Sequence, residues 1–388
     1  MRPLRETVVP LLKDLPAAQA LDFNGAVRAT DYSTSGYVTT WKMGLEWTPI
    51  NDIRFRGTQS MDIRAPNLSN LFGYSNGHGT NVDPFAGNIS VPSYTVTGGN
   101  PDLKPEKAHQ TELGFVLQPR FMPGFHLSVD WWRIRITGAI STLTAQFELQ
   151  ECYNSRSGNS YTGTSQYCSL ITRNPDNSLN SVEVIPFNVA SFLAQGIDYQ
   201  ADYRTRLDNF IAKAPGNIQF SIAATNTEKL ITNTGIPGPA QILNSAGYSA
   251  STTAGSGAPK WASFVSLAYD LDPWRFVWQE RFVSAVKASN TYIQCGMNCP
   301  AVIPAGFSTI DWDQRIPSYF VANVSMQYKF MEGDRGKNAQ LFLGVDNVFN
   351  RIPPWARTIP GQLFQVNTNP TLYDTLGLYV HAGIRLQL

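Results

Sequence analysis

Apolar and polar residues alternate along most of the chain. Within residues 37–48, alternate positions carry large apolar side chains: Tyr37, Trp41, Met43, Leu45 and Trp47. Successive side chains of a β-strand point to opposite faces of the sheet, so this segment is predicted to be an amphipathic strand. Residues 320–330 and 376–388 repeat the pattern, and weaker versions of it run through the rest of the sequence.

The alternation predicts about thirteen strands, many of them ten or more residues long. Strands of soluble proteins average about 5–6 residues, whereas a tilted strand needs about 9–11 residues to cross a bilayer. One face would line a wet interior and the other would meet lipid. A slip in the alternation at Trp131-Trp132-Arg133 predicts a bulge. The predicted strands cover residues 5–13, 20–32, 37–48, 53–65, 109–118, 123–137, 196–206, 217–227, 260–271, 274–286, 320–330, 338–350 and 376–388.

Short and long connections alternate along the chain, and the short link at residues 33–36 is the one exception. Outer-membrane barrels have short periplasmic turns and long extracellular loops. We therefore expect one unit, residues 1–388, with all the long loops outside the cell. These loops are predicted at residues 66–106, 139–195, 231–258, 287–315 and 351–372.

The composition agrees with a membrane barrel and removes several other classes. Charged residues make up 15% of the 388 residues, against about 25% in soluble domains. The chain has no run of about 18 apolar residues, which a spanning helix requires. A formal net charge of +1 gives no electrostatic basis for binding nucleic acid. Helical membrane proteins, basic nucleic-acid binders and disordered chains are therefore excluded, and no nucleic-acid partner is expected.

The four cysteines fall in pairs within two long loops. Cys152 and Cys168 lie in the loop at residues 139–195, and Cys295 and Cys299 lie in the loop at residues 287–315. A metal or redox site at the second pair is the alternative, but it lacks a nearby second ligand pair and the C-x-x-C spacing of redox motifs. We therefore expect the disulfides Cys152–Cys168 and Cys295–Cys299, which require an oxidising compartment.

The first residues have no leader. Met1 to Glu6 are basic at the start, but no apolar segment or cleavage site follows. By itself this pattern indicates a cytoplasmic protein. Because disulfides contradict that compartment, we expect that a leader has been lost.

Several segments resemble the C-terminal half of a TonB-dependent outer-membrane receptor. The resemblance covers nearly the whole chain in the right order. Its segments are Arg64-Ala65-Pro66-Asn67-Leu68-Ser69-Asn70-Leu71-Phe72, Gly99-Asn100-Pro101-Asp102-Leu103-Lys104-Pro105-Glu106, Gly196-Ile197-Asp198, Gly344-Val345-Asp346-Asn347-Val348-Phe349-Asn350, Tyr373-Asp374 and Gly383-Ile384-Arg385-Leu386. In place of the aromatic residue that usually closes the family's last strand, this sequence has Leu388.

The resemblance implies an all-β fold, a transmembrane antiparallel β-barrel of 22 strands with an N-terminal plug. The thirteen predicted strands would be the last thirteen, with the plug and the TonB box absent. An odd number of strands does not make a usual single-chain bacterial barrel, so we expect a truncated chain. The implied partners are outer-membrane lipid, a small-molecule substrate and TonB, which would act through the missing plug. The localisation would be the bacterial outer membrane, and the receptor would be a monomer.

No constellation of an enzyme, a metal site or a cofactor site is found in the sequence, so none of these is expected. Ligand contacts are expected instead from aromatic and histidine residues of the long loops: Phe72, Tyr74, His78, Phe85, Trp312, Trp355 and Phe364. Charged residues at the lumen-facing positions of strands are a second set of candidates, although barrel interiors are polar in any case. This set is Arg54, Arg56, Asp62, Arg64, Glu112 and Asp130.

Three functions remain open. The first is a TonB-dependent receptor that takes up a scarce solute, which could be a ferric siderophore, cobalamin or an oligosaccharide. The second is a passive porin-like channel, which would share the alternating strands but not the receptor-like segments. The third is a soluble secreted β-rich binding module. Folding without detergent or lipid would separate the third from the other two.

Overall fold

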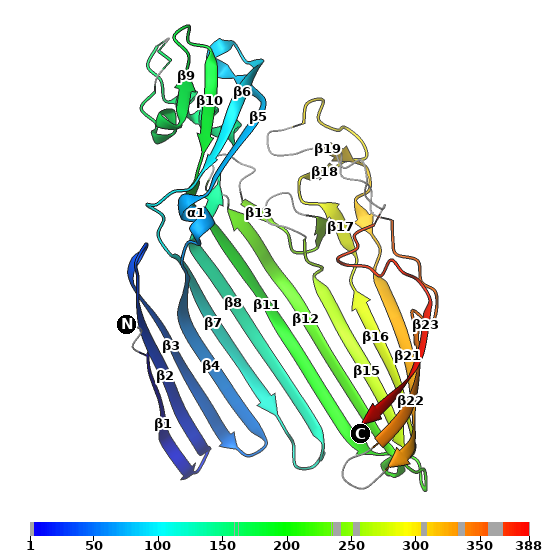
Figure 1. Cartoon of the computed structure of the whole chain (residues 1–388). Helices are drawn as coiled ribbons and strands as arrows, with labels where there is room; N and C mark the ends of the chain where they lie inside the picture. The colour runs from blue at the N-terminus through cyan, green and yellow to red at the C-terminus, as the bar shows by residue number, and fades with distance from the viewer. Residues whose placement is uncertain are drawn as a thin grey trace.

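One large sheet dominates the molecule. The computed structural model describes residues 4–158, 160–161, 163–233, 235, 242–250, 257–303, 309–332, 338–355 and 368–387. Thirteen strands follow one another across the sheet in chain order, each antiparallel to the next (Figure 1). They are β1 (Leu4–Leu15), β2 (Ala18–Tyr32), β3 (Gly36–Ile50), β4 (Ile53–Arg64), β7 (Glu106–Leu117), β8 (Phe125–Thr142), β11 (Pro186–Arg206), β12 (Asn217–Asn233), β15 (Trp261–Leu271), β16 (Trp274–Val283), β21 (Tyr319–Glu332), β22 (Asn338–Asp346) and β23 (Tyr379–Gln387).

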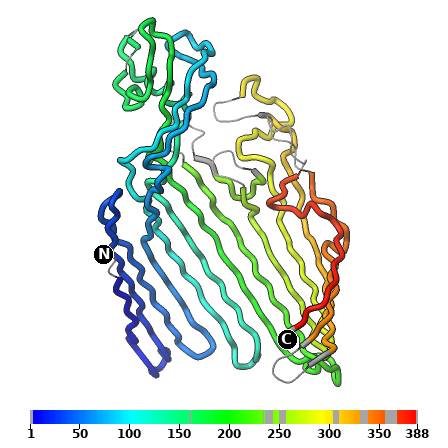
Figure 2. The backbone as a smooth tube through the Cα atoms, viewed as in Figure 1, coloured from blue at the N-terminus to red at the C-terminus, as the bar shows by residue number. Residues whose placement is uncertain are grey.

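The predicted all-β fold and its thirteen long strands are confirmed. A further short strand, β13 (Ile242–Asn244), extends the sheet beside β12. Figure 2 shows the strands tilted side by side, as closure of a barrel requires. Among the described helices, none has the length and apolar character needed to cross a membrane.

The bulge predicted around Trp131-Trp132-Arg133 is wrong. The register of β7 with β8 runs without a break from Lys107, opposite Thr137, to Leu117, opposite Leu127. Trp132 lies on the polar face, and a Cβ at Gly196 would come within 2.8 Å of its indole ring. Trp132 is a large aromatic residue at a polar-face position, where it packs against a glycine. It therefore interrupted the alternation of the sequence without any change in register. The irregularities of β8 lie nearer its loop end, opposite Asn188 to Phe192.

Two strands extend beyond the predicted limits. β8 continues to Thr142 and β11 begins at Pro186, and these two residues pair at the top of the ladder. The chain between the two strands is thus shorter than the predicted loop at residues 139–195. The extension depends on pairing between two segments, which the alternation within either segment does not reveal.

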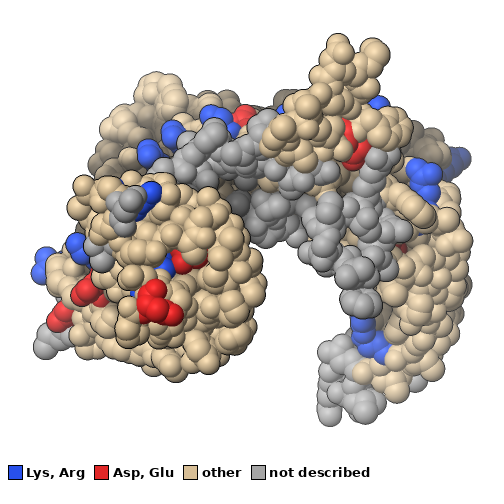
Figure 3. Space-filling model, turned by 90° about the horizontal axis from the view of Figure 1, so that it is seen from above, with Lys and Arg blue, Asp and Glu red and all other residues tan. Residues whose placement is uncertain are grey.

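The sheet is curved, and its described part has two free edges. Seen from above in Figure 3, it forms an arc, and most of the visible outer surface carries no charged residue. Large apolar side chains on that outer face are exposed, among them Leu113, Leu343 and Ile384. Within the described residues, β1 and β23 are the two ends of the sheet order. Because eleven strands lie between them and each strand is antiparallel to the next, β1 and β23 run in the same direction.

Two loops join to form a small folded unit above β4 to β11 (Figures 1 and 2), here called the two-loop module. It comprises residues 65–105 and the described part of residues 143–185. Its four-stranded sheet has the order β5-β6-β10-β9, and β6 and β10 from different loops pair in parallel. Its elements are α1 (Leu68–Phe72), β5 (Tyr74–Asp83), η1 (Pro84–Ala86), β6 (Ile89–Gly98), α2 (Ala145–Asn154), η2 (Gln166–Leu170), β9 (Ile171–Arg173) and β10 (Leu179–Val184).

The later loops carry shorter elements around a second core. That core includes Val283, Tyr292, Ile316, Tyr319 and Tyr373. Both predicted disulfides, Cys152–Cys168 and Cys295–Cys299, are present. The remaining elements are η3 (Leu207–Asn209), β14 (Tyr248–Ala250), β17 (Val286–Ser289), β18 (Tyr292–Gln294), β19 (Thr309–Asp311) and β20 (Arg315–Ile316).

Candidate functional site

The polar face of the sheet gathers all six of the predicted lumen residues. Arg54, Arg56, Asp62 and Arg64 occupy alternate positions of β4. Register carries the same face across the neighbouring strands: Thr58 stands opposite Glu112, and Arg56 stands opposite Gly114, which pairs with Asp130. The alternation of side chains therefore places these charges together on the concave, polar face of the sheet, here called the wall.

Ion pairs neutralise most of this wall. The Nε and Nη2 atoms of Arg56 donate to the two carboxylate oxygens of Asp130, each at 2.7 Å. Gly114 lies between them, and a Cβ there would come within 2.0 Å of Asp130 Oδ1, so the glycine leaves room for the contact. Arg64 binds Glu106 in the same bidentate way, with its Nε 2.6 Å from Oε2. Bidentate pairs of this kind fix geometry as well as charge.

A cavity of about 630 Å³ opens on this wall beside the Arg56–Asp130 pair. Its volume lies within the range of about 300–1,000 Å³ that is usual for small-molecule sites. Groups of both signs line it, with hydroxyl and amide groups between them, so it suits a polar solute held by several hydrogen bonds. Its lining includes Lys42, Glu46, Arg56, Thr58, Glu112, Asp130, Trp132, Asp198, Gln200 and Thr225.

A second cavity, of about 560 Å³, lies between β15–β22 and the segment that leads into β23. Arg281 Nη2 donates to the carbonyl oxygen of Leu372 at 3.0 Å, and the Tyr319 hydroxyl donates to the carbonyl oxygen of Asp374 at 3.4 Å. These bonds hold the segment across the wall. Sequence reasoning missed this site, although Gln279 and Arg281 occupy alternate positions of a predicted strand.

The aromatic loop candidates have different environments. Phe72, Tyr74, Trp312 and Trp355 are exposed, with 61%, 75%, 67% and 77% of their surface accessible. The ring of His78 packs edge-on against Tyr94, with centroids 5.1 Å apart. Phe364 lies outside the described residues.

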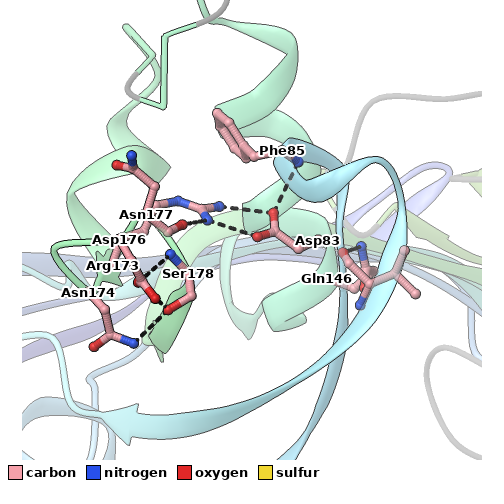
Figure 4. A network of polar contacts seen from close by, with 9 residues as sticks. Asp83, Phe85, Gln146, Arg173, Asn174, Asp176, Asn177 and Ser178 are labelled. Atoms are coloured by element: carbon pink, nitrogen blue, oxygen red, sulfur yellow. Dashed lines mark hydrogen bonds and ion pairs between the residues drawn. The ribbon is translucent and has the colours of Figure 1, made fainter.

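Phe85, the remaining aromatic candidate, belongs to the interior of the two-loop module. It stacks on Tyr161, meets Tyr153 edge-on and lies 4.5 Å below the guanidinium of Arg173. Arg173 in turn binds Asp83 at 2.8 and 2.9 Å, and the Phe85 N–H donates to the same carboxylate (Figure 4). The ring therefore helps to join the two loops.

One carboxyl group in the module is buried without a partner. Glu148 of α2 has no accessible surface, and neither carboxyl oxygen has a hydrogen-bond partner among the described residues. Burial, together with the nearby carboxylate of Glu183, raises the pKa of Glu148 to about 8. An isolated charge is costly in an apolar environment, so Glu148 is protonated at neutral pH.

With this geometry established, the chain can be compared with known families. Residues 12–348 match the family described as TonB dependent receptor-like, beta-barrel. The chain belongs to this family. TonB-dependent receptors of this kind are outer-membrane transport proteins and not enzymes, which confirms the expected location and class.

Solved receptors share the fold of this TonB-dependent receptor barrel. The siderophore receptor PirA from Acinetobacter baumannii is 16% identical, with a TM-score of 0.57. The ferric enterobactin receptor PfeA from Pseudomonas aeruginosa, as a Q482A mutant in complex with enterobactin, is 14% identical, with a TM-score of 0.58. The FrpB iron transporter from Neisseria meningitidis is 13% identical, with a TM-score of 0.52. Each match covers 99% of this chain and 45% of the other, so this chain spans less than half the length of those receptors.

Two of the receptor-like sequence segments, residues 64–72 and 99–106, lie at the base of the two-loop module. Asn67 caps α1, and its side chain accepts a bond from the Asn70 N–H at 2.7 Å. The Asn100 N–H donates to the Asn70 carbonyl, and the Asn100 side chain donates to the carbonyl of Pro186. In this receptor barrel, the two segments therefore fix the point at which both loops leave the wall.

Proposed function

We propose that this receptor barrel takes up a scarce small solute across the outer membrane by an energy-coupled route. The observation that carries the proposal is the cavity on the polar wall, where Arg56, Glu112 and Asp130 converge with neutral polar groups. A site of this kind provides specific binding, which a carrier of scarce solutes requires. The exposed loop aromatics Phe72 and Tyr74 would make the first contact.

The substrate belongs to one of three classes, a ferric siderophore, cobalamin or an oligosaccharide. The solved relatives named as siderophore or enterobactin receptors support the first class by fold. We further propose that TonB acts on the receptor through a plug domain that is not among these 388 residues, and that the receptor works as a monomer.

A passive porin-like channel is the competing function. A passive channel requires an open path through the barrel. It does not require convergent polar groups or a cavity of ligand size. A soluble secreted module is disfavoured by the apolar outer face, where Leu113 has 57% of its surface exposed. A contiguous exposed apolar surface is expected where protein meets lipid.

Uptake by the native host distinguishes these functions. Deletion of the gene should abolish growth on one limiting nutrient, and a protonophore or loss of TonB should stop uptake of that nutrient by the parent. Uptake that continues after de-energisation would identify a passive channel.

Substitution at the wall tests the site itself. Arg56→Gln combined with Asp130→Asn should reduce uptake at least tenfold with unchanged receptor abundance. Arg206→Gln, which removes an exposed pair with Asp208 in a turn, is the control and should leave uptake unchanged. Equal uptake by the wall variant and the control would remove this cavity from the transport route.

A further inference from the structure

We propose that the free edge of β5 in the two-loop module binds an extended peptide by adding it as an antiparallel strand. This edge belongs to the module rather than to the transport wall, so the proposal goes beyond solute uptake. It rests on the proposed function only for the outward placement of the loops, which makes the partner an extracellular protein segment.

Among the described residues, β5 is the end strand of its sheet and pairs on one side only, with β6. Its hydrogen-bonded partners are the odd-numbered residues, because Pro92, which has no N–H, stands opposite Thr80. The N–H and C=O groups of Asn76, His78 and Thr80 therefore point away from β6. Among the described residues no further strand covers them, and β5 is exposed over most of its length.

The side chain of Gln146 already makes strand-like hydrogen bonds with this edge. Its Nε2 donates to the carbonyl oxygen of Val82 at 2.8 Å, and its Oε1 accepts from the Val82 N–H at 2.8 Å (Figure 4). This is the pair of bonds that the N–H and C=O groups of one residue in an incoming strand would make. Gln146 occupies one position of the row, and no hydrogen bond from another described residue reaches the next three outward positions, at Thr80, His78 and Asn76.

Residues 74–82 of β5 lack the usual protection of an edge. Native edges are commonly guarded by charged residues or proline, and residues 74–82 contain neither Lys, Arg, Asp, Glu nor Pro. Glycine inside a strand often marks the close approach of another backbone. Among the described residues, one atom lies within 4 Å of a Cβ at Gly77, the Thr95 carbonyl oxygen at 3.9 Å, and none lies that close to a Cβ at Gly79. Packing inside the module therefore does not explain either glycine.

The two glycines also indicate which side chains the peptide carries. On β6, Gly77 faces Thr95 and Gly79 faces Ser93, so both glycines lack a large cross-strand neighbour. Aromatic side chains across from strand glycines cover the exposed backbone. In the proposed pairing, residues opposite the glycines occupy the non-hydrogen-bonded sites, where side chains come closest. The expected ligand is an extended segment with aromatic residues at alternate positions.

A second copy of this chain fits the edge less well. Two receptors in one membrane are related by an axis along the membrane normal, and β5 climbs away from the barrel (Figure 1). Such an axis would bring the two β5 strands together in parallel, which is the less stable arrangement.

The test uses a capped seven-residue peptide of alternating threonine and tyrosine, added to the full chain folded in detergent. Saturable binding is expected by fluorescence anisotropy. N-methylation of the threonines, whose N–H groups would face β5, should abolish binding, whereas N-methylation of the tyrosines should leave it intact. Equal effects of the two modifications, or no binding of the unmodified peptide, would overturn the proposal.

Variants of Thr80 provide the matched test on the protein. Thr80→Pro removes one outward N–H that the β5–β6 ladder does not use, and should weaken peptide binding at least tenfold. Thr80→Ala keeps the N–H and should bind as the parent does. Unchanged binding by Thr80→Pro, or dimers cross-linked through β5, would contradict the proposal. If Thr80→Pro fails to fold, the two N-methylated peptides on the parent protein decide the question. Neither readout depends on transport, so failure here leaves the uptake proposal standing.

Discussion

The guanidinium of Arg173 binds the carboxylate of Asp83 through two hydrogen bonds, of 2.8 and 2.9 Å, and so joins two loops that are ninety residues apart. The Asp83 side chain is buried and that of Arg173 is nearly so, with 1% and 10% of their surface accessible. A buried pair of this kind leaves a costly unpaired charge when one partner is removed.

Asp83→Asn should therefore loosen the two-loop module while the barrel stays folded. Removal of one partner from a buried pair costs about 3–5 kcal/mol. Hydrogen exchange at β5, β6 and β10 should accelerate, and limited proteolysis should cut the module first. Arg206→Gln, at an exposed pair, is the control and should change neither readout. Exchange that stays at the parent's rate in Asp83→Asn would show that the pair does not hold the loops together.

Glu148 should make the module less stable as the pH rises. The folded pKa of about 8 lies above the ordinary value of 4.5, so the unfolded state loses its proton first. The contribution of Glu148 to the free energy of unfolding is fully present below pH 4.5. It decreases progressively from there to about pH 8 and then levels off, with a total loss on the order of a few kcal/mol.

Glu148→Leu should remove this pH dependence, because leucine has no titratable group and suits a fully buried position. Hydrogen exchange of α2 between pH 5 and 9 measures the effect. Glu151→Gln on the same helix is the control and should keep the parent's dependence. The interpretation fails if Glu148→Leu shows the same slope as the parent.

Loss of the Cys152–Cys168 disulfide should destabilise the two-loop module. Loss of the Cys295–Cys299 disulfide should destabilise the loop that contains it by a smaller amount. The two bonds span sequence separations of 16 and 4. In the chain-entropy model a disulfide that closes a longer loop stabilises the folded state more, by about 3 kcal/mol for a loop of ~15 residues. Double Cys→Ser variants at each pair, compared by proteolysis rate without reductant, test the order. Equal or reversed rates would contradict it.

Leu113→Lys should impair folding into detergent or lipid. Leu113 lies on the outer face of β7, where a lysine costs about 2–4 kcal/mol at the bilayer centre. Gln219→Lys, on the polar face of β12, is the matched control and should fold as the parent does. Heat-dependent mobility in gel electrophoresis measures the folded fraction. Equal folded fractions for the two variants would show that the outer face does not meet lipid.

The sequence alone determined the wall. A strand repeats every two residues, so the positions from Tyr37 to Trp47, or from Arg54 to Arg64, reveal their faces without knowledge of any neighbour. The alternation of loop lengths, the cysteine pairs and the receptor-like segments can likewise be recognised from short stretches of sequence. The fold class, the strands and the polar face could therefore be predicted from the chain.

Only the tertiary structure decided what the loops do. The parallel pairing of β6 with β10, the bond from Arg173 to Asp83 and the burial of Glu148 join segments that share no local period. For the same reason the sequence pattern did not reveal the bond from Arg281 to Leu372, and it wrongly predicted a bulge at Trp132. Contacts across ninety residues depend on which loops the curved wall brings together, and no pattern within either loop encodes that choice.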